Sequence, residues 1–175
     1  MKLLLVEDYY GTEFHRTVLH KLQNLGIVDA RGIEVRRVPA KECNVAMVRK
    51  IKAILFPEIE SSKIVIAIDS EGIPPSEAAK RVPMHFEKDR GIDSKRVRVV
   101  VVSPRHEAWL CIGLGLDRRA CRIHPEDLIA DRRNLKSYEK RYLASLARNI
   151  DVAKLMNEPD FEEYIDALRW LSEDP

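Results

Sequence analysis

The chain has 175 residues, of which 45% are hydrophobic and 33% are charged, and its formal net charge is +2. This length suits one domain with a substantial core, and the composition excludes an intrinsically disordered chain. No apolar run approaches the roughly 20 residues of a membrane helix, and the first acid comes too early for a signal peptide, whose apolar region has about 7–15 residues. We therefore expect residues 1–175 to form a single domain that resides in the cytoplasm and does not contact a membrane.

The cysteines and histidines form no recognised metal-binding pattern. Cys43, Cys111 and Cys121 match no zinc-site spacing, and their odd number argues against a disulfide framework, so we expect all three to be reduced. His15 and His20 belong to one helix-like segment, and we expect them to share a surface edge of that helix without a functional role.

The first third of the chain alternates strand-like and helix-like segments. Residues 2–6 form a short apolar run that is typical of a buried strand, and the helical apolar spacing that follows ends at Gly26. Residues 32–38 alternate imperfectly and predict a second strand. A second helix is predicted from its cap at Asn44 to a stop before Pro57.

The middle of the chain carries the clearest strand signals. Residues 63–68 are apolar after the first lysine, which predicts a strand buried on both faces of a parallel sheet. Residues 96–102 predict a fourth strand. A helix is predicted after each of these strands, the first opened by Pro74 and the second capped by Ser103 with Pro104 in its first turn.

The pattern becomes helical after about residue 137. Strands that alternate with helices favour right-handed crossovers and a parallel sheet. We therefore predict a three-layer α/β fold with a mostly parallel central sheet of about four strands and a helical C-terminal tail. Within the single domain, residues 1–116 would form the α/β core and residues 137–171 the tail packed on it.

Carboxylates follow three of the predicted strands. Glu7 follows the first strand, Asp69 and Glu71 follow the third, and the fourth leads to Glu107. The carboxyl ends of parallel strands share one edge of the sheet, where open α/β sheets bind their ligands. We therefore expect these acids, distant in sequence, to converge in space.

Several carboxylates in one place repel one another, and a hard divalent cation relieves that repulsion. Mg²⁺ prefers oxygen ligands and is often shared with substrate phosphates, so such a site suits metal-assisted phosphoryl chemistry, with one glutamate as general acid or base. Glu7, Asp69 and Glu71 are the principal candidates for a site for Mg²⁺ (or Mn²⁺), and Glu107 and Glu13 are further ones. The alternative is that such acids only cap helices.

Basic residues are concentrated in one stretch of the chain. Residues 95–141 contain twelve Lys and Arg against six Asp and Glu. This excess is compatible with binding the phosphates of DNA or RNA, through Arg105, Arg118 and Arg119, although such an excess is more often only a solvated face. A basic stretch that faces the acidic edge would favour a nuclease-like role, and one on the opposite side would favour a non-catalytic module. The high charge with a single glutamine also resembles heat-adapted proteins.

Three segments resemble motifs of Toprim domains, which occur in topoisomerases, primases, recombination proteins and nucleases. Residues 6–13, Val-Glu-Asp-Tyr-Tyr-Gly-Thr-Glu, resemble the Toprim opening Val-Glu-Gly-x-Thr-Glu, and residues 68–71, Ile-Asp-Ser-Glu, resemble its Asp-x-Asp. Residues 106–110, His-Glu-Ala-Trp-Leu, resemble the Glu-x-Trp-Leu element of small Toprim-like proteins and overcoming-lysogenization-defect nucleases. The resemblance implies a Toprim/Rossmann-like fold, Mg²⁺ near Asp69 and Glu71, and Glu7 in the acid/base position.

Two other functions compete with a Toprim-like nuclease. A phospho-receiver domain would use Asp69 as its nucleophile and Ser103 as its hydroxyl residue, but the chain has no Lys-Pro pair after a fifth strand, and residues 137–171 have no place in such a domain. A non-catalytic Toprim-like regulatory or interaction module would keep the acids for structure or bind metal without turnover.

Overall fold

The structure is a computed structural model that describes residues 1–38, 45–55, 61–80 and 93–174. Its strands are β1 (Lys2–Val6), β2 (Ile33–Arg37), β3 (Lys63–Asp69) and β4 (Val97–Val102). Its α-helices are α1 (Tyr9–Asn24), α2 (Val45–Leu55), α4 (His106–Gly113), α5 (Arg118–Cys121), α6 (Pro125–Arg132), α7 (Arg141–Leu146) and α8 (Pro159–Ser172). Residues 75–80 are also helical, and short 3₁₀ helices are formed by η2 (Ser94–Arg96), η3 (Ala147–Asn149) and η4 (Val152–Leu155).

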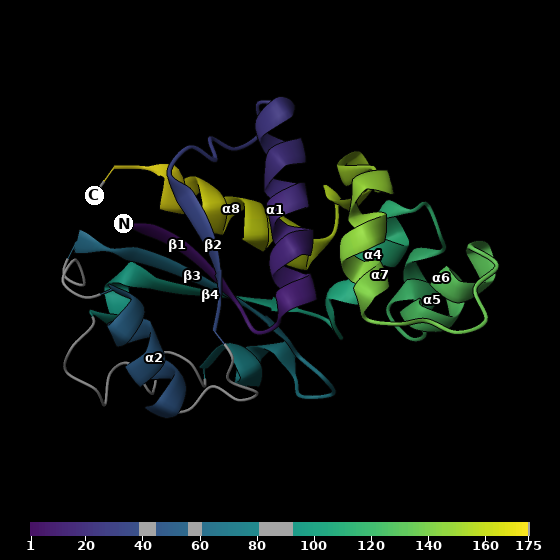
Figure 1. The fold of residues 1–175 in the computed structure, drawn as a ribbon, viewed down its shortest axis with the longest axis horizontal. Helices are drawn as coiled ribbons and strands as arrows, with labels where there is room; N and C mark the ends of the chain where they lie inside the picture. Colours follow the sequence, from purple (N-terminus) through teal and green to yellow (C-terminus); the bar gives the residue numbers. More distant parts are fainter. Residues whose placement is uncertain (39–44, 56–60, 81–92, 175) are drawn as a thin grey trace.

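The four strands form one parallel sheet in the order β2-β1-β3-β4, which confirms the predicted α/β fold (Figure 1). The central strands β1 and β3 are adjacent, and Val6 of β1 is aligned with Ala67 of β3. Asp69 at the end of β3 is aligned with Val102 of β4. The carboxyl ends of these three strands therefore lie along one edge.

Helices cover both faces of the sheet. In Figure 1, α1 and α8 lie on one face and α2 on the other. Successive residues of β1 point to opposite faces, as the strand period of two requires. Leu4 and Val6 join the larger core under α1, α4 and α8, whereas Leu3 and Leu5 join the smaller core under α2. The sheet is thus the middle layer of three, and its strands are apolar on both sides because both sides are covered.

The C-terminal helices pack against the rest of the fold. The apolar side chains of the predicted stripe in α8 are all buried: Phe161, Tyr164, Ile165, Leu168 and Leu171. Helix α8 packs against β4, β3 and β1, so it forms part of one covering layer. Figure 1 shows α4, α5, α6 and α7 gathered beyond the carboxyl ends of the strands. No helix in the described ranges is long and apolar enough to span a bilayer.

Lysines from the sheet secure the end of α8. The Lys63 Nζ donates hydrogen bonds to the carbonyl oxygens of Trp170, at 3.0 Å, and Glu173, at 3.1 Å. The Lys2 Nζ donates to the carbonyl of Ser172. These carbonyls have no partner within the helix, and a cation near a helix C-terminus is favourable, so the amino ends of β1 and β3 hold the last turn in place.

Two sequence predictions are wrong, one about the state of the cysteines and one about the cap of α4. Cys111 and Cys121 form a disulfide rather than remaining reduced, because the turn between α4 and α5 brings their Cα atoms to 5.6 Å; Cys43 lies outside the described residues. Ser103 does not cap α4, which begins at His106. The Ser103 N–H is instead bonded to Asp160 at 3.2 Å, so the neighbouring α8 holds this loop away from helical geometry. The predicted cap Asn44 lies outside the described residues.

Candidate metal centre at the carboxyl edge of the sheet

The acids predicted to converge do meet at the carboxyl edge. Glu7 directly follows β1, Asp69 ends the adjacent β3, and Glu71 lies in the turn after it. The pKa of the half-buried Glu7 carboxyl is raised from 4.5 to about 7, first by burial and then by the negative charges of Asp69, Glu71 and Asp8. Lys140 opposes this shift only in part. The edge therefore carries a local excess of negative charge.

The turn that carries Glu71 is held in an uncommon conformation. Glu71 has a φ of +44°, in the left-handed region that disfavours residues with a side chain. Its N–H donates to the Pro104 carbonyl at 3.0 Å, and the Ser70 N–H donates to the Val102 carbonyl at 2.9 Å. Two backbone bonds to the end of β4 thus fix the turn, and the Glu71 side chain is exposed beside Asp69.

Asp69 is anchored by the start of α4. Its Oδ1 accepts a hydrogen bond from the His106 backbone N–H at 2.9 Å and contacts His106 Nδ1 at 2.5 Å. Burial would raise the pKa of Asp69, but the interaction with His106 outweighs it, and the pKa is lowered. The partner shift is consistent, because burial would lower the pKa of His106, and the Asp69 carboxylate raises it.

Behind His106 lies a buried polar chain that the sequence analysis missed. His106 Nε2 is 2.8 Å from His15 Nε2, and His15 Nδ1 is 2.7 Å from the Tyr164 hydroxyl. His15 is fully buried, so its predicted place on a surface edge is wrong, whereas His20 is exposed. The spacing did hold a signal, because His15 lies four residues after the buried Gly11 on the apolar stripe of α1.

Glu107 reaches the same region from the first turn of α4. Its side chain is buried, and its Oε1 lies 3.0 Å from Lys140 Nζ and accepts a hydrogen bond from the Tyr138 hydroxyl at 3.2 Å. Its Oε2 is buried and has no hydrogen-bond partner within the described ranges. Lys140 Nζ also lies 3.6 Å from Asp8 Oδ2. Burial would lower the pKa of Lys140, but the surrounding acids raise it, so this lysine stays charged.

Tyr138 and Lys140 were also missed as part of this site. They precede α7 in a segment predicted to be helical from residue 137, whereas the structure begins α7 at Arg141. The non-helical approach lets both side chains reach α4. No motif in the sequence marks them, since their contact with Glu107 depends on how the tail folds back.

Two acids near the first strand take other roles. The Asp8 side chain caps α1 by accepting a hydrogen bond from the Gly11 N–H at 2.6 Å. Glu13 forms an ion pair with Arg16, which itself donates to the Val35 carbonyl of β2 at 3.2 Å. Glu13 therefore lies with the β2 side of α1, and its role as a ligand stays a prediction.

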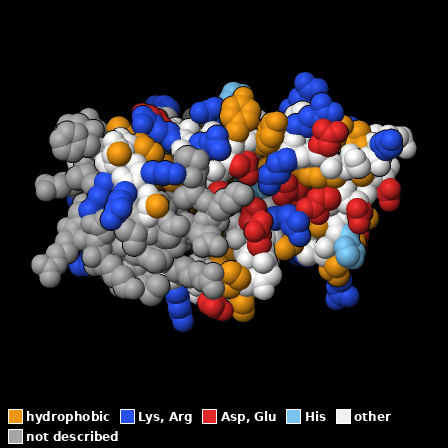
Figure 2. Space-filling model, turned by 60° about the horizontal axis from the view of Figure 1, so that its bottom comes forward, with side chains coloured by type: hydrophobic (Ala, Val, Ile, Leu, Met, Phe, Trp, Pro, Cys, Tyr) orange, Lys and Arg blue, Asp and Glu red, His pale blue; other side chains and the backbone are white. Residues whose placement is uncertain are grey.

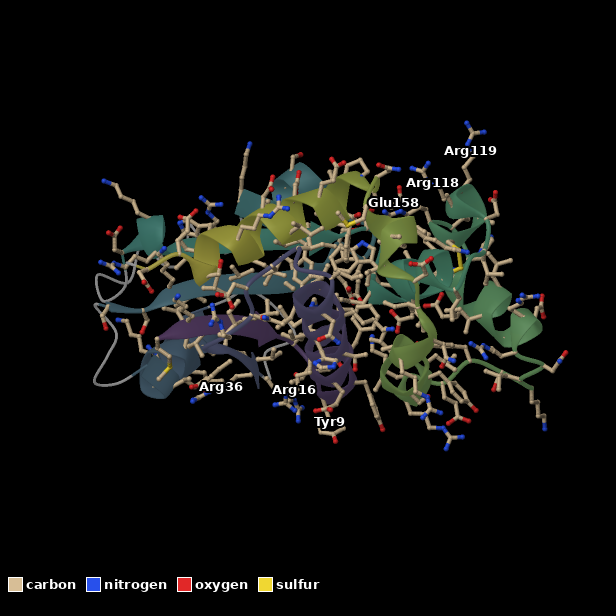
Figure 3. All side chains as sticks on the ribbon, turned by 90° about the horizontal axis from the view of Figure 1, so that it is seen from above. Tyr9, Arg16, Arg36, Arg118, Arg119 and Glu158 are labelled. Atoms are coloured by element: carbon tan, nitrogen blue, oxygen red, sulfur yellow. A yellow bond between two sulfur atoms is a disulfide. The ribbon has the colours of Figure 1, made fainter. Side chains whose placement is uncertain are left out.

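The predicted nucleic-acid-binding arginines make different contacts, with Arg118 and Arg119 at one pocket and Arg105 at the start of α4. Arg105 precedes α4 and pairs with Glu126 at 2.9 Å. Arg118 pairs with Glu158 at 2.5 Å, and both line, with the exposed Arg119, a pocket between β4, α5 and the start of α8. Figure 3 shows Arg118, Arg119 and Glu158 on the opposite side of the molecule from Tyr9 and Arg16. On the face seen in Figure 2, acidic and basic side chains are interspersed beside the region drawn in grey.

The described part of the chain contains no group of three His, Cys, Asp or Glu side chains already arranged to hold a metal ion. Its carboxylates are close enough to perturb the Glu7 pKa, but their oxygens do not form a ready-made cage. Comparisons of this chain with models of protein families, with curated proteins and with solved structures found no match.

Proposed function

We propose that this protein is a Toprim-like divalent-metal-binding protein that acts on the phosphodiesters of DNA or RNA. The observation that carries the proposal is the position of Glu7 beside Asp69 and Glu71 at the carboxyl edge, where burial and then the charges of these two acids raise the pKa of Glu7 to about 7. Such crowding costs free energy in the absence of a cation, and it is typical of sites built to bind one.

The donor set fits Mg²⁺ or Mn²⁺. The oxygens are carboxylates, the ligands that hard cations prefer, and the buried Oε2 of Glu107 has no partner among the described residues. Asp69 and Glu71 would hold the cation, with Glu107 beside them. The cation would supply Lewis-acid polarisation of a phosphodiester and a bound water.

Residues of the chain account for the remaining tasks. Glu7, with a pKa near neutrality, can hold or release a proton at the edge as a general acid or base. Lys140 stays charged between Glu107 and Asp8, so it supplies a positive charge that a phosphate approaching this edge would meet. Arg105 directly precedes His106, whose backbone N–H binds Asp69.

Calorimetric titration with Mg²⁺ and Mn²⁺ tests the cation site. The wild type is compared with Asp69→Asn combined with Glu71→Gln, and with Glu162→Gln combined with Asp166→Asn, which removes two exposed acids of α8 and serves as the matched control. We expect binding in the wild type and the control and none in the edge variant. A folded wild type that binds no metal at millimolar concentration, with or without a short oligonucleotide, contradicts the proposal.

Turnover is tested separately from binding. Cleavage of single- and double-stranded DNA and RNA is measured with Mn²⁺ for the wild type and for Glu7→Gln. We expect cleavage that Glu7→Gln lowers by about 100-fold or more, in keeping with loss of a general acid or base. Metal binding without cleavage of any of these substrates would instead assign the protein to the non-catalytic, regulatory or interaction class.

A further inference from the structure

Four side chains from four elements form one buried line of hydrogen bonds that ends at the acidic edge. The line runs from Tyr164 on α8 to His15 on α1, then to His106 on α4 and Asp69 at the end of β3. The three contacts measure 2.7, 2.8 and 2.5 Å. The line connects the covering helices of the core directly to a carboxylate of the candidate metal centre.

A purely apolar core would not need these groups. His15 and Tyr164 are fully buried and His106 is 4% exposed, and burying such polar groups is costly unless every one is hydrogen-bonded. Both ring nitrogens of each histidine have a partner, so this requirement is met. The indole ring of Trp109 packs edge-on against both imidazoles, with centroid distances of 6.3 and 5.7 Å, and holds their ring planes.

Along this line each side chain donates a hydrogen bond to the next one, from Tyr164 to Asp69. The Asp69 carboxylate can only accept, so His106 Nδ1 carries a proton and donates it to Asp69 Oδ1. Nε2 of a neutral His106 is then an acceptor, and its partner, His15 Nε2, carries the donated proton. Burial lowers the pKa of His15 and keeps this ring neutral, so its Nδ1 is left to accept from the Tyr164 hydroxyl.

This direction leaves one oxygen of Asp69 for another ligand. The backbone N–H and the ring Nδ1–H of His106 both bind Oδ1. Of the hydrogen bonds made by the described residues, none reaches Oδ2. Two donors on one oxygen fix the plane of the carboxylate and leave Oδ2 for another ligand, beside the Glu7 carboxyl with which Asp69 interacts.

We propose that His106 is the positioning residue that orients Asp69 as a cation ligand, and that His15 and Tyr164 hold His106 in the tautomer this requires. The inference rests on the proposed function, because it assigns a task to residues behind the same site. Hydrogen-bonded partners of this kind orient a ligand and raise its affinity for the metal, and their loss weakens binding by about 10–100-fold.

The tautomers are tested by NMR on the metal-free protein with ¹⁵N-labelled histidine, at a pH where both rings are neutral. We expect His106 with its proton on Nδ1 and His15 with its proton on Nε2. In Tyr164→Phe, which keeps the ring packing and removes the hydroxyl, we expect His15 to lose its single tautomer. A wild-type His106 that carries its proton on Nε2 overturns the inference, whether or not the protein binds metal.

The positioning role is tested by Mn²⁺ titration of two variants. His106→Asn keeps a side-chain donor close to the position of Nδ1, and His106→Leu has none. We expect the Asn variant to bind within about threefold of the wild type and the Leu variant to bind about 10–100-fold more weakly. A folded Leu variant with wild-type affinity, or an Asn variant as weak as Leu, overturns the inference.

Two further outcomes remain decisive. If the Leu variant does not fold, the titration is made with Tyr164→Phe, for which weaker Mn²⁺ binding supports the inference and wild-type binding contradicts it. If the wild type itself binds no metal, the proposed function fails, and the tautomer of His106 alone decides whether Asp69 is oriented as inferred.

Discussion

Glu7 shows how a single carboxyl links the chemistry of this edge to the stability of the fold. The pKa of Glu7 is about 7 in the folded protein and 4.5 in an unfolded chain, so the folded state binds this proton more tightly than the unfolded state does. Stability is therefore lost as the pH rises from 4.5 through about 7.

Glu7→Gln is accordingly expected to stabilise the protein at neutral and alkaline pH. Because the carboxyl is only partly buried and its charge is screened by water, we expect a gain in the free energy of unfolding of about 1 kcal/mol at about pH 8. The gain should vanish below pH 4.5, where both states are protonated. Urea unfolding across this pH range measures it, with the exposed Glu162→Gln as control. A gain that is independent of pH would exclude charge as its cause.

Lys140 gives a second prediction at the scale of one residue. Among the described residues, Lys140→Met leaves the Tyr138 hydroxyl, at 3.2 Å, as the one partner of the buried Oε1 of Glu107. Removing one member of a charged pair exposes the desolvation cost of the other, so we expect a loss of about 2 kcal/mol in the free energy of unfolding. Adding Glu107→Gln to Lys140→Met should recover most of this loss.

The control for this pair is Lys136→Met, which removes an exposed lysine from the same segment and should change stability by less than about 0.5 kcal/mol. A thermodynamic cycle over the three Lys140 and Glu107 variants gives the coupling directly. If the two single losses simply add in the double variant, Lys140 and Glu107 do not interact.

Among the elements, α4 and α5 are joined covalently. The disulfide between Cys111 and Cys121 closes a loop across ten positions, and such a loop stabilises a fold by about 2–3 kcal/mol. We expect Cys111→Ala with Cys121→Ala to lower the free energy of unfolding by this amount.

The state of the cysteines can be measured without any variant. Alkylation of the denatured protein followed by mass spectrometry should label one cysteine before reduction and all three after it. Labelling of all three without a reductant would restore the reduced state that the sequence predicted. The unfolding difference should likewise disappear when both proteins are measured in a reductant.

Strands and acids were predictable from the sequence to different depths. The strand runs carry their own signal, because a strand covered on both faces must be apolar throughout, as residues 63–68 are. Once the sheet is parallel, strand direction places Glu7 and Asp69 at the same edge, and the adjacency of β1 and β3 brings them together. The roles of these acids as ligands stay predictions.

The remaining errors share a physical origin in contacts between distant elements. His15 and His106 lie 91 residues apart, and neither looks unusual beside its own neighbours. The cysteine pair depends on the turn between two helices. Local patterns determine which elements form, whereas these contacts depend on how the elements are placed.

At the scale of the molecule, the sheet has helices from both ends of the chain on the same face. Helix α1 directly follows the first strand, and α8 ends at Ser172, yet both cover the larger core. Lys2 and Tyr164 illustrate the consequence, since each contacts residues more than 140 positions away. The fold is therefore closed by contacts between its earliest and latest elements.

The position of α8 has a consequence during synthesis. While a ribosome is still adding residues 159–172, the β1, β3 and β4 surface that α8 will cover is left open to water. A nascent chain at that stage exposes apolar side chains on a finished sheet, the condition under which chains associate wrongly or recruit chaperones. Folding of this protein should thus be completed only after α8 has left the ribosome, however early the sheet forms.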